Sequence, residues 1–304
     1  MASVVPIIVG PTAVGKTALS VLLSEHFPLE VVSADSRQIY KYMDIGTAKP
    51  DKAILQKIKH HFIDILEPDA YYSAGMFGKD ARQVIKEIRD KGILPLVVGG
   101  SGLYIRALVD GLFEADLRDE ALRRSLKEEC GRVGLDRMYE RLQKIDAPYA
   151  AKISPSDQKR ILRALEVWEL SGKKISELQK EKTPAEFVPL FFGLTAERPI
   201  LYERINRRVD EMLKSGLLEE VEKLYDRGYT RGLNALNTVG YKEVFDYLEG
   251  KLNYNDMEEH IKRNTRRYAK RQLTWFRQDS RIRWIQVDTA SHLDKAAEII
   301  SAQL

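Results

Sequence analysis

The stretch Gly10-Pro11-Thr12-Ala13-Val14-Gly15-Lys16-Thr17 decides the fold of this chain. It fits the phosphate-binding pattern G-x-x-x-x-G-K-[ST] at every fixed position. The apolar run Val4–Val9 before it has strand character, and the apolar spacing within Lys16–Phe27 after it is helical. Strand, glycine-rich turn and helix are the context that this motif requires. The sequence therefore predicts a loop that binds a diphosphate, a triphosphate or a pyrophosphate.

The chemistry of this loop follows from its residue types. Its backbone amides form a concave set of donors, and the N-terminus of the following helix adds positive potential where a phosphate sits. We expect Lys16 to reach the outer phosphate as a point charge and the Thr17 hydroxyl to hold Mg²⁺.

Composition places the chain among ordinary globular proteins. It has 304 residues, 44% hydrophobic and 31% charged, with a net charge of +4. The single cysteine, Cys130, excludes an internal disulfide and suits a reducing compartment. Neither a signal sequence nor an apolar run long enough to span a membrane is present, so a cytoplasmic location is expected.

Two further strands are predicted to end near the phosphate loop. Leu29–Ser33 reads as a buried strand, and Asp35 follows its carboxyl end, where ligands gather in open α/β sheets. The strand Ile93–Val98 ends in Gly99-Gly100-Ser101-Gly102. Nucleotide hydrolases of this class commonly carry a metal-binding Asp there, so we expect the metal to rest on Thr17, substrate phosphates and water.

The sequence predicts a parallel α/β core interrupted by a helical insertion. Between residues 115 and 186 strand-like runs give way to charged helical patterns, at Asp116–Cys130, Leu135–Ile145 and Ser156–Leu170. Strand character returns at Phe187–Thr195. We therefore predict a P-loop NTPase-like core from residues 1–114 and 187–304, with an all-helical domain inserted at 115–186. A strand is also expected within His61–Leu66.

Positive charge is concentrated near the C-terminus, in the predicted helix Asp256–Phe276 and just beyond it. From Lys262 to Arg283 the chain carries nine Lys or Arg residues and one acid, Asp279. Pairs recur every four residues and form two adjacent rows, the charge pattern expected of a polyanion-binding surface.

These residues together indicate group transfer to a large anionic acceptor. Asp35 is the natural general base, since it can accept a proton from an acceptor nucleophile. A phosphoryl-transferring kinase and a transferase that expels pyrophosphate both remain open. A non-catalytic RNA-binding ATPase is disfavoured because the strand-end metal Asp is missing.

The sequence resembles the tRNA dimethylallyltransferases nearly from end to end. The blocks that carry the resemblance are the phosphate loop, Asp35–Tyr40, Met43–Pro50, Gly99–Tyr104, Arg160–Glu166, Val239–Glu243 and Tyr268–Arg277. So many separated blocks in one order are far more specific than a phosphate loop alone.

The resemblance implies a reaction and a set of site residues. The family transfers the dimethylallyl group of dimethylallyl pyrophosphate to the adenosine 3′ of the tRNA anticodon, with Mg²⁺. It implies that the loop Gly10–Thr17 and Arg208 bind the pyrophosphate and that Asp35 is the base, with Lys16 and Thr17 also catalytic. The tRNA contacts it implies are Asp35, Ser36, Arg37, Gln38, Ser101, Arg123, Lys159, Arg160, Ile161, Leu162 and Arg163.

Two alternative activities stay open beside this one. An adenylate isopentenyltransferase would act on a mononucleotide, which needs neither the basic insertion nor the basic helix. A P-loop small-molecule kinase would need ATP and turn over without RNA. We expect a monomer.

Overall fold

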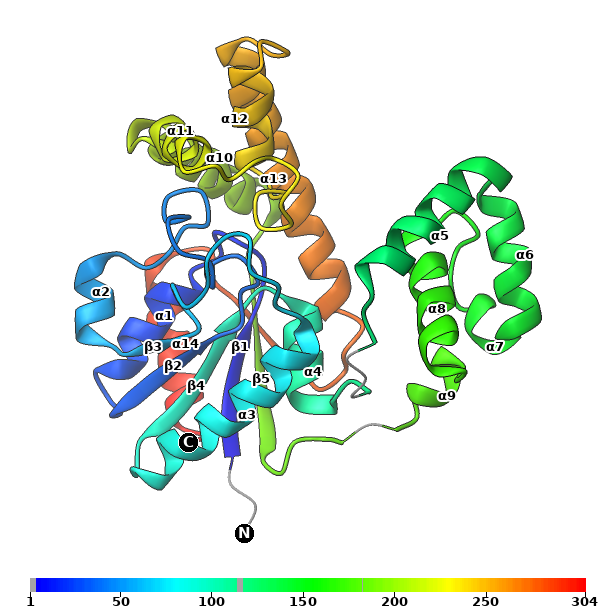
Figure 1. Ribbon diagram of the computed structural model, residues 1–304. Coiled ribbons are helices and arrows are strands. Elements are labelled where there is room, and N and C mark those ends of the chain that lie inside the picture. Colours follow the sequence, from blue (N-terminus) through cyan, green and yellow to red (C-terminus); the bar gives the residue numbers. More distant parts are fainter. Residues whose placement is uncertain (1–3, 114–116, 182) are drawn as a thin grey trace. The chain divides into compact units, whose positions relative to one another are not determined.

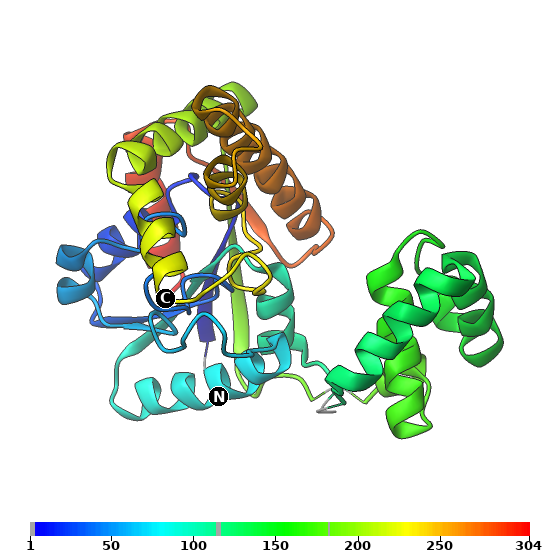
Figure 2. The ribbon, with the colours of Figure 1, turned by 45° about the horizontal axis from the view of Figure 1, so that its top comes forward.

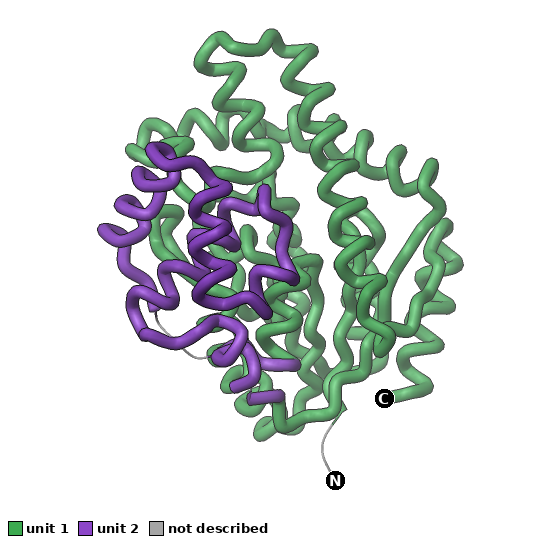
Figure 3. The backbone as a smooth tube through the Cα atoms, turned by 90° about the vertical axis from the view of Figure 1, so that its right-hand side faces the viewer, with its two compact units in different colours: residues 1–109, 185–304 green, residues 110–184 purple. Residues whose placement is uncertain are grey.

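The computed structural model describes residues 4–113, 117–181 and 183–304, and the chain divides into two compact units. The first unit comprises residues 1–109 and 185–304, and the second comprises residues 110–184 (Figure 3). The sequence places the insertion at residues 115–186. Its predicted start, and the predicted helix start at Asp116, lie outside the described residues.

The first unit is built on a six-stranded parallel sheet in the described part of the chain (Figure 1). Its strands in spatial order are β3 (His60–His61), β2 (Leu29–Ser33), β4 (Leu94–Gly99), β1 (Val4–Val9), β5 (Val188–Thr195) and β6 (Arg283–Gln286). On central strand β1, Ile8 pairs with Val98 on β4 and with Phe192 on β5. Parallel strands that are covered on both faces consist of continuous apolar runs, and such runs can be recognised as strands in the sequence. The predicted α/β class is confirmed.

Helices cover the sheet and its carboxyl edge. Figure 1 shows α3 passing in front of the sheet and α14 behind it, and Figures 1 and 2 show α10–α13 beyond the carboxyl ends of the strands. The helices of this unit are α1 (Lys16–Ser24), α2 (Lys52–Lys57), α3 (Ala74–Asp90), α4 (Gly102–Asp110), α10 (Arg198–Lys214), α11 (Leu217–Asp226), α12 (Tyr241–Leu248), α13 (Tyr254–Phe276) and α14 (Ala290–Ser301).

The main core fixes the phosphate loop between strand and helix. Ile8 on β1, Leu19 on α1 and Phe192 on β5 are fully buried in one apolar cluster. Burying each such side chain contributes about 1.5–3 kcal/mol. The loop between β1 and α1 is therefore held at both ends by the apolar core of the unit.

The second unit is helical throughout its described residues. It contains α5 (Glu120–Val133), α6 (Leu135–Ile145), α7 (Ala147–Ala150), α8 (Gln158–Ser171) and α9 (Ile175–Leu178). Its own apolar core joins Leu126, Leu142, Ile161 and Leu165 with the buried Cys130. A separate core is what an independently packed insertion requires.

The strand predicted within His61–Leu66 is wrong beyond its first residue. Only His60–His61 pairs with β2, because Phe62 and Asp64 have φ angles of 64° and 54°. Left-handed residues end an extended strand. The amides of Ile65 and Leu66 instead donate to the carbonyl of Ile39 at 3.0 and 3.1 Å, so this segment packs against the loop after β2.

Membrane-spanning helices are also absent from the described residues. None of the helices there combines the length and the apolar character needed to cross a bilayer.

Candidate active site

The phosphate loop depends on two glycines. Gly10 has a φ of 149°, and a Cβ there would lie 2.6 Å from the carbonyl oxygen of Leu194 on β5. Gly15 has a φ of 110° and is the N-cap of α1. Only glycine combines this backbone with such close packing, so both positions are required for the loop to turn back towards the helix.

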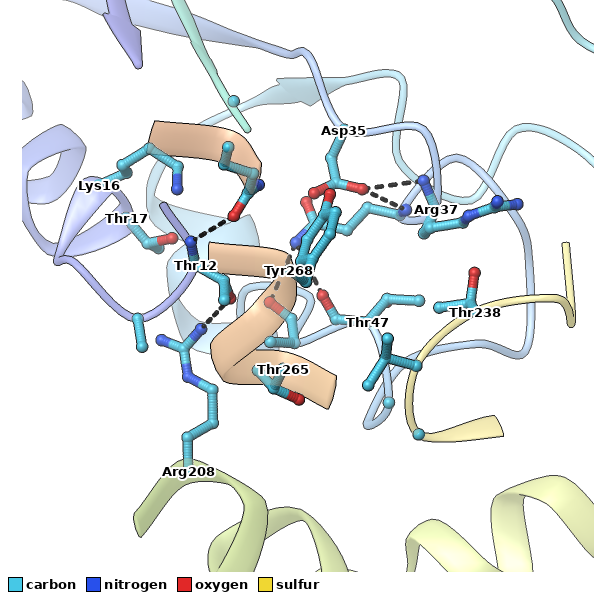
Figure 4. A pocket seen from close by; sticks show the side chains of 18 of the residues that line it. Thr12, Lys16, Thr17, Asp35, Arg37, Thr47, Arg208, Thr238, Thr265 and Tyr268 are labelled. Atoms are coloured by element: carbon cyan, nitrogen blue, oxygen red, sulfur yellow. Dashed lines mark hydrogen bonds between the residues drawn. The ribbon is translucent and has the colours of Figure 1, made fainter. Parts of the chain in front are cut away.

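Lys16 lies on the inner side of this loop. Its Nζ donates to the carbonyl oxygens of Gly10 and Pro11 at 3.0 and 2.7 Å. Burial lowers the pKa of Lys16 to about 8, partly opposed by the negative charge of Asp35 and reinforced by the positive charge of Arg208. Figure 4 shows Lys16 and Thr17 in the wall of one cavity, with Asp35 on the other side of it.

Arg208 on α10 joins the loop from a distant part of the sequence. Its Nη1 donates to the Thr12 hydroxyl at 3.2 Å (Figure 4). Burial lowers the pKa of Arg208 from its usual value, but a guanidinium stays protonated in proteins. The structure therefore places a permanently charged guanidinium near Lys16, where the resemblance predicts a pyrophosphate contact.

Asp35 is oriented by the backbone that follows it. Its Oδ1 accepts hydrogen bonds from the amides of Arg37 at 2.8 Å and Gln38 at 3.4 Å (Figure 4). These bonds fix one carboxylate oxygen and leave Oδ2 as the oxygen for a substrate proton. A carboxylate held this way in a cavity wall suits a general base.

Ser101 meets the same segment from the end of β4. Its hydroxyl accepts a hydrogen bond from the Ser36 amide at 3.0 Å and donates to the Ser36 hydroxyl at 3.3 Å. The two strand ends come this close because β4 ends in glycine: a Cβ on Gly99 would lie 2.2 Å from the Ala34 carbonyl oxygen. The glycine at the end of β4 thus permits this close backbone approach.

Gln272 on α13 is a site residue that the sequence reasoning missed. Its Oε1 accepts from the Thr12 amide at 2.9 Å, and its Nε2 donates to the Gly100 carbonyl at 3.0 Å. Gln272 is buried, with 6% of its surface exposed. The signal in the sequence is its spacing: Gln272 lies at helical intervals from Ala269 and Phe276, on the buried side of α13.

These residues surround two cavities that share a wall. The first, of about 490 Å³, is lined by the phosphate loop, Asp35–Gln38 and Arg208. The second, of about 370 Å³, carries aromatic side chains, namely Tyr40, Tyr72, Tyr104 and Trp275. Residues that line both are Ser36, Arg37, Tyr268, Arg271 and Gln272. The structure thus brings the predicted phosphate site and the predicted base together.

A metal cage built from protein ligands is not found. Within residues 4–113, 117–181 and 183–304, no group of three or more His, Cys, Asp or Glu side chains could hold a metal. Thr17, the second residue of α1, lines the cavity beside the phosphate loop. This donor set fits Mg²⁺, which is commonly held by one or two protein oxygens together with phosphates and water.

Arg123 and Arg163, predicted tRNA contacts, have a structural role in the second unit. Arg123 Nε and Arg163 Nη1 each lie 2.7 Å from a different carboxylate oxygen of Glu166. Burial opposes ionisation of Glu166, but hydrogen bonds from the two arginines hold its pKa below the usual value. Arg163 also donates to the Leu117 carbonyl.

The predicted contact segment Lys159–Arg163 therefore divides into different environments. Ile161 is fully buried in the unit's core and Leu162 packs against that core, which removes the Ile161 side chain from any RNA contact. Lys159 and Arg160 are exposed. Arg160 lies 3.2 Å from the Asp157 carboxylate, so Lys159 has the more open charge of the two.

The two basic rows predicted on α13 differ in the same way. Lys262 is bonded to Asp210 and Glu258 at 2.6 Å each, and Arg266 donates to Asn206 at 2.6 Å. The exposed cations from Lys262 to Arg283 are Arg263, Arg267, Lys270, Arg271, Arg277, Arg281 and Arg283. Lys262 and Arg266 thus help to dock α13 on α10, and the row of Arg263, Arg267 and Arg271 is exposed.

Fold and site together define a phosphate-loop α/β protein with a second, aromatic-lined cavity beside its phosphate loop. Residues 38–279 match the family model described as IPP transferase. The chain belongs to the IPP transferase family.

Relatives and solved structures agree over nearly the full length. A tRNA dimethylallyltransferase of Thermotoga neapolitana is 48% identical, covering 94% of this chain and 93% of the relative. A tRNA isopentenylpyrophosphate transferase structure from Bacillus halodurans is 40% identical, with a TM-score of 0.73 and coverage of 100% and 97%. A structure of a eukaryotic dimethylallyltransferase acting on tRNA is 30% identical, with a TM-score of 0.84 and coverage of 99% and 78%.

Proposed function

We propose that this chain is a tRNA dimethylallyltransferase. It transfers the dimethylallyl group of dimethylallyl pyrophosphate to the exocyclic amine of the adenosine 3′ of the anticodon in tRNA and releases pyrophosphate. The observation that carries this proposal is that the phosphate loop and the carboxylate of Asp35 line the same cavity. Full-length similarity to proteins named for this reaction supports it.

The reaction needs a stabilised leaving group. The allylic C–O bond breaks readily when the charge that develops on the pyrophosphate is held by fixed donors. The loop amides, Lys16 and Arg208 supply these donors on one side of the cavity. The allylic carbon is then exposed towards the Asp35 side.

The acceptor needs a base. As the new C–N bond forms, the exocyclic amine loses a proton, and Asp35 accepts it on the oxygen that its own backbone does not engage. The electron pair of the broken C–O bond leaves with the pyrophosphate. Asp35 therefore acts on the nucleophile, while Lys16 and Arg208 act on the leaving group.

Mg²⁺ is part of the proposal. We assign Thr17 as its protein ligand, because this residue lies in the first turn of α1, beside the phosphate loop, and carries a hydroxyl. When bound, the ion neutralises charge on the pyrophosphate oxygens.

A tRNA substrate accounts for the exposed cations. The base that reacts must leave the anticodon stack and enter the cavity, as in other enzymes that act on a base. Arg263, Arg267 and Lys270 on α13 and Lys159 and Arg160 in the second unit are the residues that we assign to the RNA backbone. Monomeric state and cytoplasmic location remain predictions.

Labelled dimethylallyl pyrophosphate tests this function against its alternatives. The protein and Mg²⁺ are incubated with unmodified tRNA that carries adenosine 3′ of the anticodon, and AMP replaces the tRNA in a parallel reaction. We expect label in the tRNA only. Label in AMP alone would make the protein an adenylate isopentenyltransferase, and ATP consumption without prenyl transfer would make it a kinase.

A further inference from the structure

We propose that Glu220 and Tyr241 are positioning residues for this reaction, because they hold the loop Asp44–Ala48, which in turn orients Gln38 and Asp35. This rests on the prenyl transfer proposed above. Glu220 is on α11 and was not singled out by the sequence, and Tyr241 begins α12 and was noted only as part of the block Val239–Glu243, without a role.

Four donors converge on the Glu220 carboxylate. Its Oε2 accepts from the amides of Asp44 at 2.9 Å and Ile45 at 2.7 Å. Its Oε1 accepts from the amide of Gly46 at 3.1 Å and from the Tyr241 hydroxyl at 2.6 Å. Three consecutive amides on one carboxylate clamp the backbone of the loop, since charge-assisted bonds are about twice as strong as neutral ones.

Tyr241 contacts both Glu220 and the loop. It is fully buried, and burial followed by the charge of Glu220 raises its pKa well above the usual value, so the phenol remains a donor. A Cβ on Gly46 would lie 2.5 Å from the Tyr241 ring. The loop therefore rests directly on this ring, and only glycine permits the contact.

The clamped loop carries backbone strain. Ala48 has a φ of 51°, a left-handed conformation that a non-glycine residue keeps only when its surroundings enforce it. The turn is held by its own backbone, because the Ala48 amide donates to the Ile45 carbonyl at 2.9 Å and the Lys49 amide to the Asp44 carbonyl at 3.1 Å. Lys49 Nζ adds bonds to the Tyr40 carbonyl at 2.7 Å and to Asp44 at 2.6 Å. Glu220 and Lys49 thus fix the two ends of the loop.

Ala48 is also connected to the base Asp35, through Gln38. Gln38 Nε2 donates to the carbonyls of Ala48 at 3.0 Å and Thr47 at 3.2 Å. The Gln38 amide donates to Asp35 Oδ1 at 3.4 Å. Thr47 lines the same cavity as Asp35 (Figure 4). A loop released by Glu220 would therefore move Gln38 and turn Asp35 away from the acceptor amine.

Such a change should separate the two halves of the reaction. The pyrophosphate site is built from the loop after β1 and from Arg208, and none of these residues is bonded to Glu220. Misplacement of the base by about 1 Å can lower a rate by roughly 100-fold. We therefore expect a fall in kcat without a change in KM for dimethylallyl pyrophosphate.

Glu220→Gln is the variant that tests the clamp. The amide offers one acceptor oxygen in place of two, and its NH2 group faces backbone N–H donors. We expect kcat for tRNA prenylation to fall about 10- to 100-fold, with KM for dimethylallyl pyrophosphate within about 2-fold of the wild type. Glu222→Gln, at an exposed position of α11, is the matched control and should leave kcat unchanged.

Tyr241→Phe and a double-variant cycle complete the test. Tyr241→Phe keeps the ring and removes one of the four donors, so it should give a smaller kcat loss in a protein that still folds. Glu220→Gln combined with Gln38→Leu should lose less than the product of the single losses, because both act through one path. A kcat for Glu220→Gln equal to that of the control, a change in KM alone, or fully multiplicative losses would overturn the proposal. Wild-type protein that modifies no tRNA would instead refute the proposed function, and this inference with it.

Discussion

The side-chain oxygen of Gln272 on α13 accepts a hydrogen bond from the backbone amide of Thr12 in the phosphate loop, 260 positions away in the sequence. The same side chain donates to the Gly100 carbonyl beyond β4. A buried side-chain amide whose oxygen and nitrogen both have partners fixes the distance between the phosphate loop and the strand end that carries Ser101. The phosphate loop and the end of β4 are thus joined by one side chain.

Replacing Gln272 by Leu should loosen this junction. The Thr12 amide and the Gly100 carbonyl would be left buried without a partner, which costs about 1–3 kcal/mol per group. We expect a lower midpoint in thermal unfolding and a raised KM for dimethylallyl pyrophosphate. Gln278→Leu, at an exposed position just after α13, is the control. Unchanged stability and KM in the Gln272 variant would contradict this role.

Replacing Asp35 by Asn should remove the base and spare the phosphate site. General-base catalysis contributes about 100- to 10,000-fold, so we expect a kcat loss in that range. The asparagine oxygen can still accept from the Arg37 amide, so the local backbone should be retained. Calorimetric binding of pyrophosphate should match the wild type. Retained kcat would show that another group takes the proton.

The pKa of Lys16, lowered by burial to about 8, predicts how substrate affinity changes with pH. Below pH 8 the side chain is cationic, and it loses its charge as the pH rises through this value. KM for dimethylallyl pyrophosphate should therefore rise above pH 8, approaching about tenfold per pH unit.

Lys16→Arg separates this effect from other titrations. A guanidinium stays protonated throughout the range, so the rise in KM above pH 8 should disappear in this variant even if its absolute KM is poorer. A KM that rises equally in both proteins would assign the titration to a different group.

Arg163 and Lys159 should respond differently to replacement by alanine. Arg163 is bonded to the buried Glu166, and hydrogen bonds to charged groups are worth about 1.5–3 kcal/mol. Arg163→Ala should therefore lower the free energy of unfolding in urea. Lys159 is exposed, so Lys159→Ala should keep stability within about 0.5 kcal/mol and weaken tRNA binding in a salt-dependent way. Equal stability of the two variants would contradict the structural role of Arg163.

Much of the fold could be predicted from the local pattern of apolar residues in the sequence. The strands β1, β2, β4 and β5 are continuous apolar runs, and α6 has the predicted bounds Leu135–Ile145, because burial on both faces of a sheet or one face of a helix leaves a periodic record. The phosphate loop and Asp35 were found for a similar reason, since each directly follows a strand.

Contacts between segments that are distant in the sequence could not be predicted from such local patterns. Glu220 and Gln272 look like ordinary helix residues, and their importance lies in hydrogen bonds to loops more than 170 positions away. The short helix α12 was not predicted because it is too short to show a clear apolar period. Two residues of its first turn, Tyr241 and Glu243, are buried by tertiary packing instead. The stretch His61–Leu66 was predicted wrongly because two of its residues, Phe62 and Asp64, have left-handed backbone angles that an apolar run does not reveal.

The position of the product on the tRNA tests the central claim most directly. Modified tRNA is digested to nucleosides after reaction with labelled dimethylallyl pyrophosphate, and the labelled nucleoside is identified and located by mass spectrometry. We expect one isopentenyl group, on the exocyclic amine of the adenosine directly 3′ of the anticodon, and its loss with Asp35→Asn. Label at another atom or nucleotide, or full labelling by the Asp35 variant, would contradict it.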